Sequence, residues 1–173
     1  MIKHVPELIE AGIQSFKIEG RVKTEYYVST IIKAYRDAID AYFDGRETDQ
    51  SVYDEILKVS HREYTTGFFF GNPREEGQVY GSSSYIREYD LVGIAEEYDK
   101  ATKTLTFSQR NKFCVGDTIE ILKPRGNFET LTVESMTDEK GERIENCPHP
   151  MMKVKINCPF EVPPMSMLRK KKE

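Results

Sequence analysis

The hydrophobic periodicity of this sequence changes once, close to a run rich in glycine and serine. Before it, from Glu25 to Phe43, apolar residues recur every three or four positions with charged residues between them, which predicts an amphipathic helix of about five turns. After it, short runs rich in β-branched and aromatic residues alternate with turn signals. The change in period predicts an α+β chain with two structurally different parts.

The first part has the helix start and stop signals of an α/β unit. Pro6, near the start of residues 5–11, and Gly12, just after them, predict a short helix over 5–11. Residues 13–18 then predict a short strand. Gly45 ends the long helix, and a second, shorter helix is predicted over residues 51–59. Such helix-to-strand steps are repeated in α/β barrels.

The second part reads as a small closed β-barrel or sandwich, because short strands with regular turn signals are typical of both. The predicted strands are 91–98, 104–109, 118–122, 129–136 and 152–156. The glycine- and serine-rich composition places the domain boundary before them. We therefore predict a first domain over 1–75, a linker over 76–84 and a second domain over 85–173.

Composition is that of a soluble globular protein, with 38% hydrophobic and 31% charged residues. No apolar stretch approaches the length of a membrane span and no signal-peptide core follows Met1, so we expect a cytoplasmic protein without membrane association. A net charge of -4 offers nucleic acid no broad attraction, so any RNA contact must come from local patches. The three cysteines, Cys114, Cys147 and Cys158, are odd in number and widely spaced, which predicts reduced thiols and no metal site.

Three charged residues, Lys17, Glu19 and Arg21, alternate around the end of the predicted strand at Gly20. Such charges cannot all lie unpaired in an apolar core. At the C-terminal end of a barrel strand they would line the mouth of an active site. The alternative is a salt-bridged set that holds the next loop, and spacing alone favours that structural reading.

His61 and Arg62 offer a titratable imidazole beside a guanidinium, a pair suited to acid-base or phosphate-binding work. A lone histidine at a helix end is more often a capping or packing residue, and that alternative is favoured here. The sequence contains none of the familiar hydrolase, metalloprotease or phosphate-loop motifs. It therefore shows no self-sufficient active site.

Two short basic runs are candidates for contact with phosphates. Arg110, Asn111 and Lys112 follow a predicted strand, where a basic run can meet a nucleic-acid backbone, although a solvated turn has the same composition. The charged run 169–172 reads as an exposed terminus and is weak evidence for phosphate binding.

Several segments of the sequence are together specific for one family. They are Pro6-Glu7-Leu8-Ile9-Glu10-Ala11-Gly12, Ser15-Phe16-Lys17-Ile18-Glu19-Gly20-Arg21, Tyr35-Arg36-Asp37-Ala38-Ile39-Asp40, Ser60-His61-Arg62-Glu63-Tyr64-Thr65-Thr66-Gly67-Phe68, Gln109-Arg110-Asn111-Lys112-Phe113 and Pro148-His149-Pro150. In these segments the chain resembles the collagenase-like peptidases of family U32. The resemblance implies a catalytic (β/α) barrel followed by a small, mostly antiparallel β-barrel resembling domain 2 of translation factors. Residues 1–75 would then be the C-terminal end of the catalytic barrel, in a C-terminal piece that is inactive alone.

The family carries peptidase and collagenase labels, yet members similar to this chain are linked to forming 5-hydroxyuridine at the tRNA wobble position with prephenate as hydroxyl source. The resemblance implies an iron-sulfur cluster in the parent protein, held by cysteines that precede this chain, and no cofactor here. Lys17, Glu19, Arg21 and His61 then become candidates for an active-site rim, and Arg62, Arg110, Asn111 and Lys112 for substrate binding.

The expected partners are tRNA or a protein substrate and the N-terminal catalytic domain. Self-association is expected too, because a truncated barrel leaves apolar helix faces without their partner strands. Two other functions stay open at this point. In one, the parent is a true protease whose β-barrel serves protein docking or oligomerisation. In the other, the β-barrel only stabilises the catalytic domain.

Overall fold

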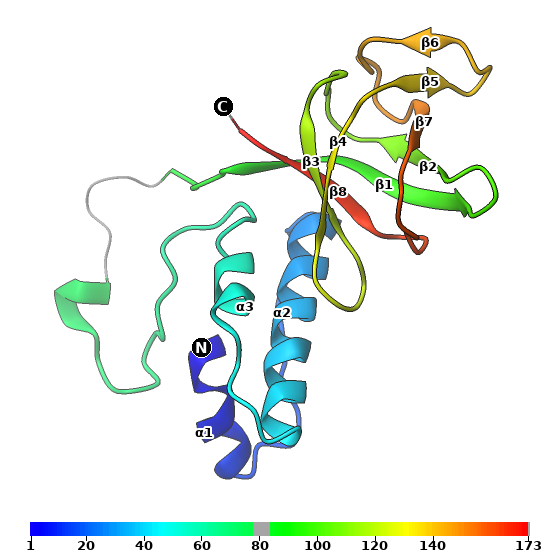
Figure 1. Cartoon of the computed structure of the whole chain (residues 1–173). Helices are drawn as coiled ribbons and strands as arrows, with labels where there is room; N and C mark the ends of the chain where they lie inside the picture. The colour runs from blue at the N-terminus through cyan, green and yellow to red at the C-terminus, as the bar shows by residue number, and fades with distance from the viewer. Residues whose placement is uncertain (78–83, 173) are drawn as a thin grey trace. The chain divides into compact units, whose positions relative to one another are not determined.

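The computed structural model describes residues 1–77 and 84–172, and the chain divides into two compact units, Met1–Glu88 and Tyr89–Glu173 (Figure 1). Within the described residues every helix belongs to the first unit and every named strand to the second, which confirms the α+β class. Most of the predicted linker 76–84 lies outside the described residues.

The long helix α2 (Glu25–Phe43) forms where the periodicity predicts it. Thr24 caps its start, since the Thr24 hydroxyl accepts a hydrogen bond from the backbone N–H of Tyr27 at 3.3 Å. Beyond its end Gly45 has a φ of +68°, a left-handed conformation that glycine adopts without strain. The buried side chains recur at helical spacing and are Tyr26, Thr30, Ile31, Ala34, Ala38 and Ala41.

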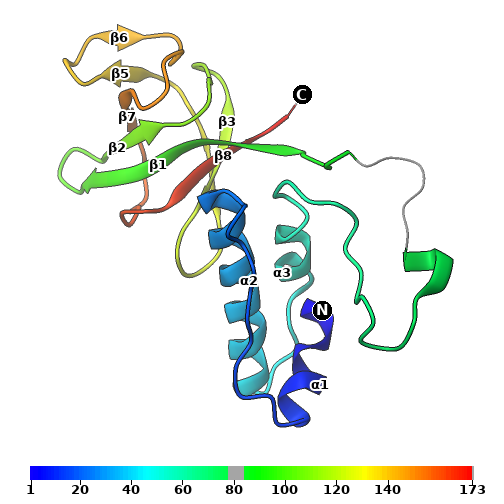
Figure 2. The ribbon, with the colours of Figure 1, turned by 180° about the vertical axis from the view of Figure 1, so that it is seen from behind.

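Two shorter helices, α1 (Val5–Glu10) and α3 (Gln50–Glu55), pack on α2 (Figures 1 and 2). A core cluster holds the first of them in place and consists of Ile2, Val5, Ala34 and Ala38. The helix predicted over 51–59 exists but is shorter. The 3-10 turns η1 (Ile2–His4) and η2 (Arg74–Gly77) complete the helical elements of this unit.

The strand predicted over 13–18 is wrong, because residues 13–20 form no strand. A strand exists through hydrogen bonds to a neighbouring strand, and the described residues offer this segment none. Ile13 is instead 45% exposed. The apolar residues of the segment are Ile13, Phe16 and Ile18, and among the described residues no ladder makes them a strand.

The second unit is a single antiparallel sheet of eight strands in the spatial order β4-β3-β8-β1-β2-β7-β5-β6. The strands are β1 (Tyr89–Asp99), β2 (Thr104–Gln109), β3 (Thr118–Leu122), β4 (Glu129–Thr132), β5 (Met136–Asp138), β6 (Arg143–Ile144), β7 (Lys153–Asn157) and β8 (Met167–Lys171). The expected mostly antiparallel β architecture is therefore present.

The predicted strands agree with the structure except at three places. Residues 129–136 hold the strand β4 and the start of β5 with a break between them, and the two-residue strand β6 was not predicted. The interpretation of 169–172 as an exposed terminus holds for Lys171 and Lys172 but is wrong for Arg169. Residues 169–171 lie in β8, which pairs with both β1 and β3, and the side chain of Arg169 is fully buried. A run of four cations gives no hydrophobic pattern from which to predict a strand.

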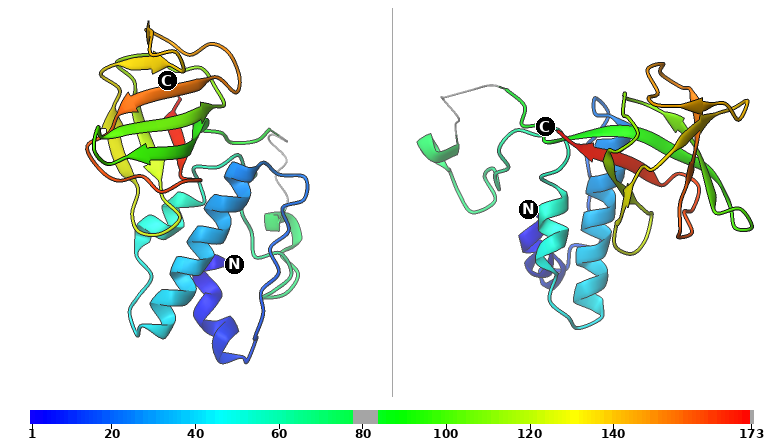
Figure 3. Two further views of the ribbon diagram at one scale, coloured as in Figure 1. Left: turned by 90° about the vertical axis from the view of Figure 1, so that its right-hand side faces the viewer. Right: turned by 45° about the horizontal axis from the view of Figure 1, so that its top comes forward.

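The sheet is strongly curled, as the two views of Figure 3 show, and its side chains form one apolar core. The largest buried side chains of this core include Leu105, Phe107, Phe113, Ile119, Ile121, Met136 and Leu168. The outermost strands in the sheet order are β4 and β6, and the segment 113–117 joins the two edges. Gly116 N–H donates to the carbonyl of Val133 at 2.8 Å, and Val115 N–H donates to that of Glu145 at 3.0 Å.

Candidate functional site

The predicted rim residues Lys17, Glu19 and Arg21 all lie at the surface of the first unit. The Glu19 carboxylate accepts a hydrogen bond from the backbone N–H of Arg21 at 2.8 Å. This bond shapes the turn that leads into α2. Among the described residues no side-chain ion pair joins the three charges to one another, so they are presented to solvent as separate groups.

His61 lies inside the first unit, with 5% of its surface exposed. Its Nδ1 lies 2.8 Å from the carbonyl of Val59, and its ring stacks on Tyr64 with centroids 4.8 Å apart. Burial, followed by the nearby Tyr27, raises the pKa of the Tyr64 phenol well above its usual range. The ring contacts of His61 are those of a packing residue, and among the described residues it makes no hydrogen bond, ion pair or ring contact with Lys17, Glu19 or Arg21.

Arg62 is exposed and lies over the ring of Tyr85, with its guanidinium carbon 5.1 Å from the ring centroid. Lys23 lies over the same ring at 4.6 Å and contacts the Tyr85 hydroxyl at 3.4 Å. The tyrosine therefore gathers two cations from distant parts of the sequence. Sequence reasoning missed Lys23 and Tyr85, because 62 residues separate them and no local pattern relates them.

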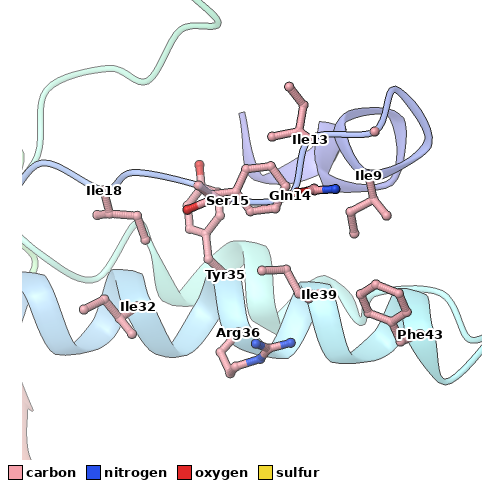
Figure 4. Close-up of a pocket in the computed structure, with 12 residues that line it drawn as sticks. Ile9, Ile13, Gln14, Ser15, Ile18, Ile32, Tyr35, Arg36, Ile39 and Phe43 are labelled. Atoms are coloured by element: carbon pink, nitrogen blue, oxygen red, sulfur yellow. The ribbon is translucent and has the colours of Figure 1, made fainter.

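An apolar groove of about 730 Å³ runs between α2 and the segment that contains residues 12–18 (Figure 4). Its apolar lining includes Ile9, Ile13, Ile18, Ile32, Ile39 and Phe43. Ile32 is 51% exposed and Phe43 is 70% exposed, so part of the apolar face of α2 has no cover within the described residues of this unit.

In the second unit, the basic run after β2 is anchored to β1 by backbone and side-chain hydrogen bonds. Arg110 N–H donates to the carbonyl of Val92 at 2.9 Å, and the Asn111 side-chain amide donates to that of Leu91 at 2.6 Å. The Arg110 guanidinium is turned back on the sheet, where it contacts the Ser108 hydroxyl at 2.6 Å. The predicted trio thus divides, with Asn111 as an anchor, Arg110 folded against the sheet and Lys112 exposed.

Lys112 lines a pocket of about 280 Å³ with residues from β1 and from the end of the chain. The full lining is Asp90, Val92, Lys112, Lys170, Lys171 and Lys172, and we call it the lysine pocket. β8 pairs directly with β1, which brings the three C-terminal lysines beside the anchored loop. Sequence reasoning treated Lys112 and the basic tail separately, because Lys112 and Lys170 are 58 positions apart in the sequence and only the β1–β8 pairing joins them.

Two lysines of the pocket contact carboxylates. Lys170 lies 2.7 Å from Asp117, and Lys172 lies 3.8 Å from Asp90. For Asp117, burial acts to raise the pKa, but the hydrogen bonds from Lys170 and from the Cys114 N–H outweigh it, so the pKa is lowered overall. In the described part of the chain, Lys112 and Lys171 have no carboxylate within ion-pair distance.

The three cysteines do not fit a metal cluster. Cys147 and Cys158 are buried, and burial raises the pKa of both thiols, which disfavours the thiolate form that ligates iron. The Cys147 thiol faces the carbonyl of Phe113 at 3.4 Å, and the Cys158 thiol faces that of Phe160 at 3.2 Å. No group of three or more His, Cys, Asp or Glu among residues 1–77 and 84–172 is placed to hold a metal ion.

Two sequence patterns of a single family match this chain in succession. The pattern of peptidase family U32 matches residues 1–79, and that of the peptidase family U32 C-terminal domain matches residues 87–169. The chain belongs to peptidase family U32. The two matched ranges meet near the division between the two structural units, so each unit corresponds to one part of the U32 architecture.

Relatives within family U32 carry two kinds of name. The chain is 37% identical to tRNA hydroxylation protein P1 of Bacillus subtilis, over 99% of this chain and 42% of that protein. It is 34% identical to tRNA hydroxylation protein P of Escherichia coli, over 85% of this chain and 32% of that protein. It is also 30% identical to a collagenase of Porphyromonas gingivalis, over 83% of this chain and 43% of that protein. The chain thus spans less than half the length of these relatives.

A solved structure also resembles part of the chain. The C-terminal domain of a U32-family protein from Geobacillus thermoleovorans is 32% identical, with a TM-score of 0.46, and the match covers 47% of this chain and 99% of that one.

No helix in the described ranges is both long and apolar enough to cross a membrane.

Proposed function

We propose that this chain is the C-terminal part of a cytoplasmic enzyme that hydroxylates the wobble uridine of tRNA. The observation that carries the proposal is the 37% identity to tRNA hydroxylation protein P1, which runs through 99% of this chain and thus through both structural units. Because this sequence identity extends through the β unit, it supports a role for the β unit in tRNA hydroxylation as well.

In this proposal the two units have different tasks. The first unit is the end of the catalytic (β/α) barrel, and Lys17, Glu19 and Arg21 belong to the rim of an active site whose chemistry lies elsewhere in the parent. The β unit is an accessory barrel of the kind found as domain 2 of translation factors, and it presents the RNA. An iron-sulfur cluster, held by cysteines outside this chain, supplies the redox chemistry in the parent. This chain alone is inactive.

The apolar groove on α2 supports the first of these tasks. An amphipathic helix of a (β/α) barrel covers strands with its apolar face, and here the exposed Ile32 and Phe43 offer such a face. The segment of residues 13–18, which has no ladder within the described residues, is the matching strand of the barrel in this proposal. Both features are accounted for by neighbouring strands from the rest of the catalytic domain.

A second candidate function rests on the 30% identity to a collagenase. In that case the parent is a protease, and the β unit is a protein-docking or oligomerisation module. The two candidates differ in substrate and in their need for iron, so they can be separated experimentally.

The test is a deletion of the gene in the organism that encodes this chain, followed by mass spectrometry of its tRNA nucleosides. We expect 5-hydroxyuridine to disappear and to return when the gene is restored. Unchanged 5-hydroxyuridine, with gelatin cleavage by the full-length protein that survives removal of iron, would instead establish the protease. The full-length protein should contain iron as purified.

A further inference from the structure

We propose that the lysine pocket is the site at which the β unit binds the phosphodiester backbone of RNA. The inference rests on the proposed function and deepens it by naming the groups that recognise the substrate. Four lysines contribute to the lining of the pocket, namely Lys112, Lys170, Lys171 and Lys172. Clusters of lysines that face one opening are the electrostatic signature of phosphate contact.

The charge balance of the pocket leaves it cationic. Asp117 and Asp90 account for two of the four ammonium groups, through Lys170 at 2.7 Å and Lys172 at 3.8 Å. Lys112 and Lys171 have no carboxylate partner within the described residues. The pocket therefore carries a surplus of positive charge on a chain whose net charge is -4, and it attracts anions locally where the whole molecule does not.

Both elements that supply the lysines are fixed to β1. The loop that carries Lys112 is held by the Asn111 amide, which donates to the carbonyl of Leu91 at 2.6 Å. β8 is held on its other side by the ion pair of Arg169 with Glu120 of β3. Cations on anchored elements lose less conformational entropy on binding than cations on a free tail, which favours a defined binding site.

The size and chemistry of the pocket favour a phosphate group as the bound moiety. A volume of about 280 Å³ lies at the lower limit of about 300–1,000 Å³ for pockets that enclose whole drug-sized ligands. Val92 is the only apolar side chain in the lining, so little surface is offered to a nucleobase. Ammonium groups act on phosphate as point charges without bidentate geometry. The pocket is thus suited to hold the RNA backbone without reading its sequence.

The experiment measures binding of the 173-residue chain to a fluorescent tRNA transcript by anisotropy over a salt series. The variant K112A/K171A removes the two lysines without a carboxylate partner. We expect it to weaken binding and to lower the slope of log K against log salt by about two, since each phosphate contact contributes about one. The matched control K100A/K140A removes two exposed lysines in the β1–β2 and β5–β6 turns, with the same change in net charge, and should leave the slope unchanged.

Equal losses in the two double variants would overturn the proposal, because the effect would then follow net charge and not the pocket. Equally tight, lysine-dependent binding of polyglutamate would overturn the choice of phosphate. The deletion test of the proposed function is independent of these results. Loss of 5-hydroxyuridine on gene deletion, with no effect of K112A/K171A on RNA binding, would leave the function standing and remove the pocket from it. A pocket-dependent salt slope in a protein whose deletion spares 5-hydroxyuridine would do the reverse.

Discussion

The guanidinium of Arg169 donates two hydrogen bonds to one carboxylate oxygen of Glu120, from Nε at 2.8 Å and from Nη2 at 2.6 Å. The two residues lie directly opposite each other on the neighbouring strands β8 and β3. The rings of Tyr89 and Phe128 lie 5.2 Å and 5.5 Å from the guanidinium carbon, and the arginine side chain is fully buried. The last strand in the sequence, β8, is thus held to β3 by an ion pair whose arginine is fully buried.

Removal of this arginine should destabilise the β unit strongly. We expect Arg169→Met to lower the free energy of unfolding by about 2–4 kcal/mol, toward the lower end of the range for broken buried pairs, because Glu120 loses its charged partner but is still 18% exposed to solvent. Glu120→Gln should cost less, since an amide oxygen still accepts one hydrogen bond. Urea unfolding, with hydrogen exchange across residues 89–172 as the local readout, measures both.

The exposed Lys171, two residues away in the same strand, is the control, and Lys171→Met should change stability by less than about 0.5 kcal/mol. Similar stabilities for the Arg169 and Lys171 variants would contradict the view that β8 depends on the ion pair of Arg169 with Glu120.

Gly93 in β1 leaves no room for a side chain. A Cβ atom built there would lie 2.5 Å from Cδ2 of Phe107 and 3.3 Å from the carbonyl of Ser108. We expect Gly93→Ala to destabilise the β unit by about 1–3 kcal/mol through overpacking. Phe107→Leu combined with Gly93→Ala should recover part of the loss relative to the sum of the two single changes. Additive effects in this double-mutant cycle would show that the clash is relieved elsewhere.

Asp117 should contribute stability that depends on pH. Its pKa is lowered in the folded protein, because the hydrogen bonds from Lys170 and from the Cys114 N–H outweigh burial. A depressed carboxyl pKa gives stability that is complete above the unfolded value of about 3.9 and is lost as the pH falls through the folded value. We therefore expect Asp117→Asn to lower the thermal midpoint at pH 7 and to reduce the loss between about pH 4 and pH 2. A uniform difference from the parent across that range would refute the assignment.

Most elements of this fold follow from local pattern. The spacing of apolar residues locates α2, the strand β2 has the predicted bounds 104–109, and the turn signals between strands fall where the chain turns. These elements are predictable because each is specified by its own residues. The predictions for the segment 13–18 and for the strand β8 were wrong for opposite reasons. The segment was predicted as a strand but has no partner strand among the described residues, and β8 has two partner strands although its residues 169–171 are all cations.

The candidate site was less predictable than the fold. Lys112 was singled out from its neighbours in sequence, but its position beside Lys170 depends on the pairing of β8 with β1, which no local pattern encodes. His61 was singled out for its titratable ring, and its burial against Tyr64 depends on contacts that only the folded unit makes. Sequence identifies residues with suitable chemistry, whereas strand pairing decides which of them meet.

The three thiols should differ in reactivity. Cys147 and Cys158 are buried, and burial raises the pKa of both, whereas Cys114 is partly exposed. We expect one thiol per chain to react quickly with a disulfide reagent such as Ellman's at pH 8, and the other two only after denaturation. Peptide mapping should place the fast label on Cys114. Fast labelling of Cys147 in the native protein would contradict the buried position that the structure gives it.

The apolar groove on α2 should drive self-association of this chain when it is produced without a larger catalytic domain. Ile32 and Phe43 are both more than half exposed on one helix, and exposed apolar surface of this kind is normally covered by a partner. We expect light scattering to show oligomers at high concentration and Ile32→Glu to shift them toward monomer. Val22→Glu places the same charge on an 87% exposed aliphatic side chain that does not line the groove, so it serves as the matched control and should have a smaller effect. A chain that stays monomeric at high concentration would mean that the groove is covered without a partner.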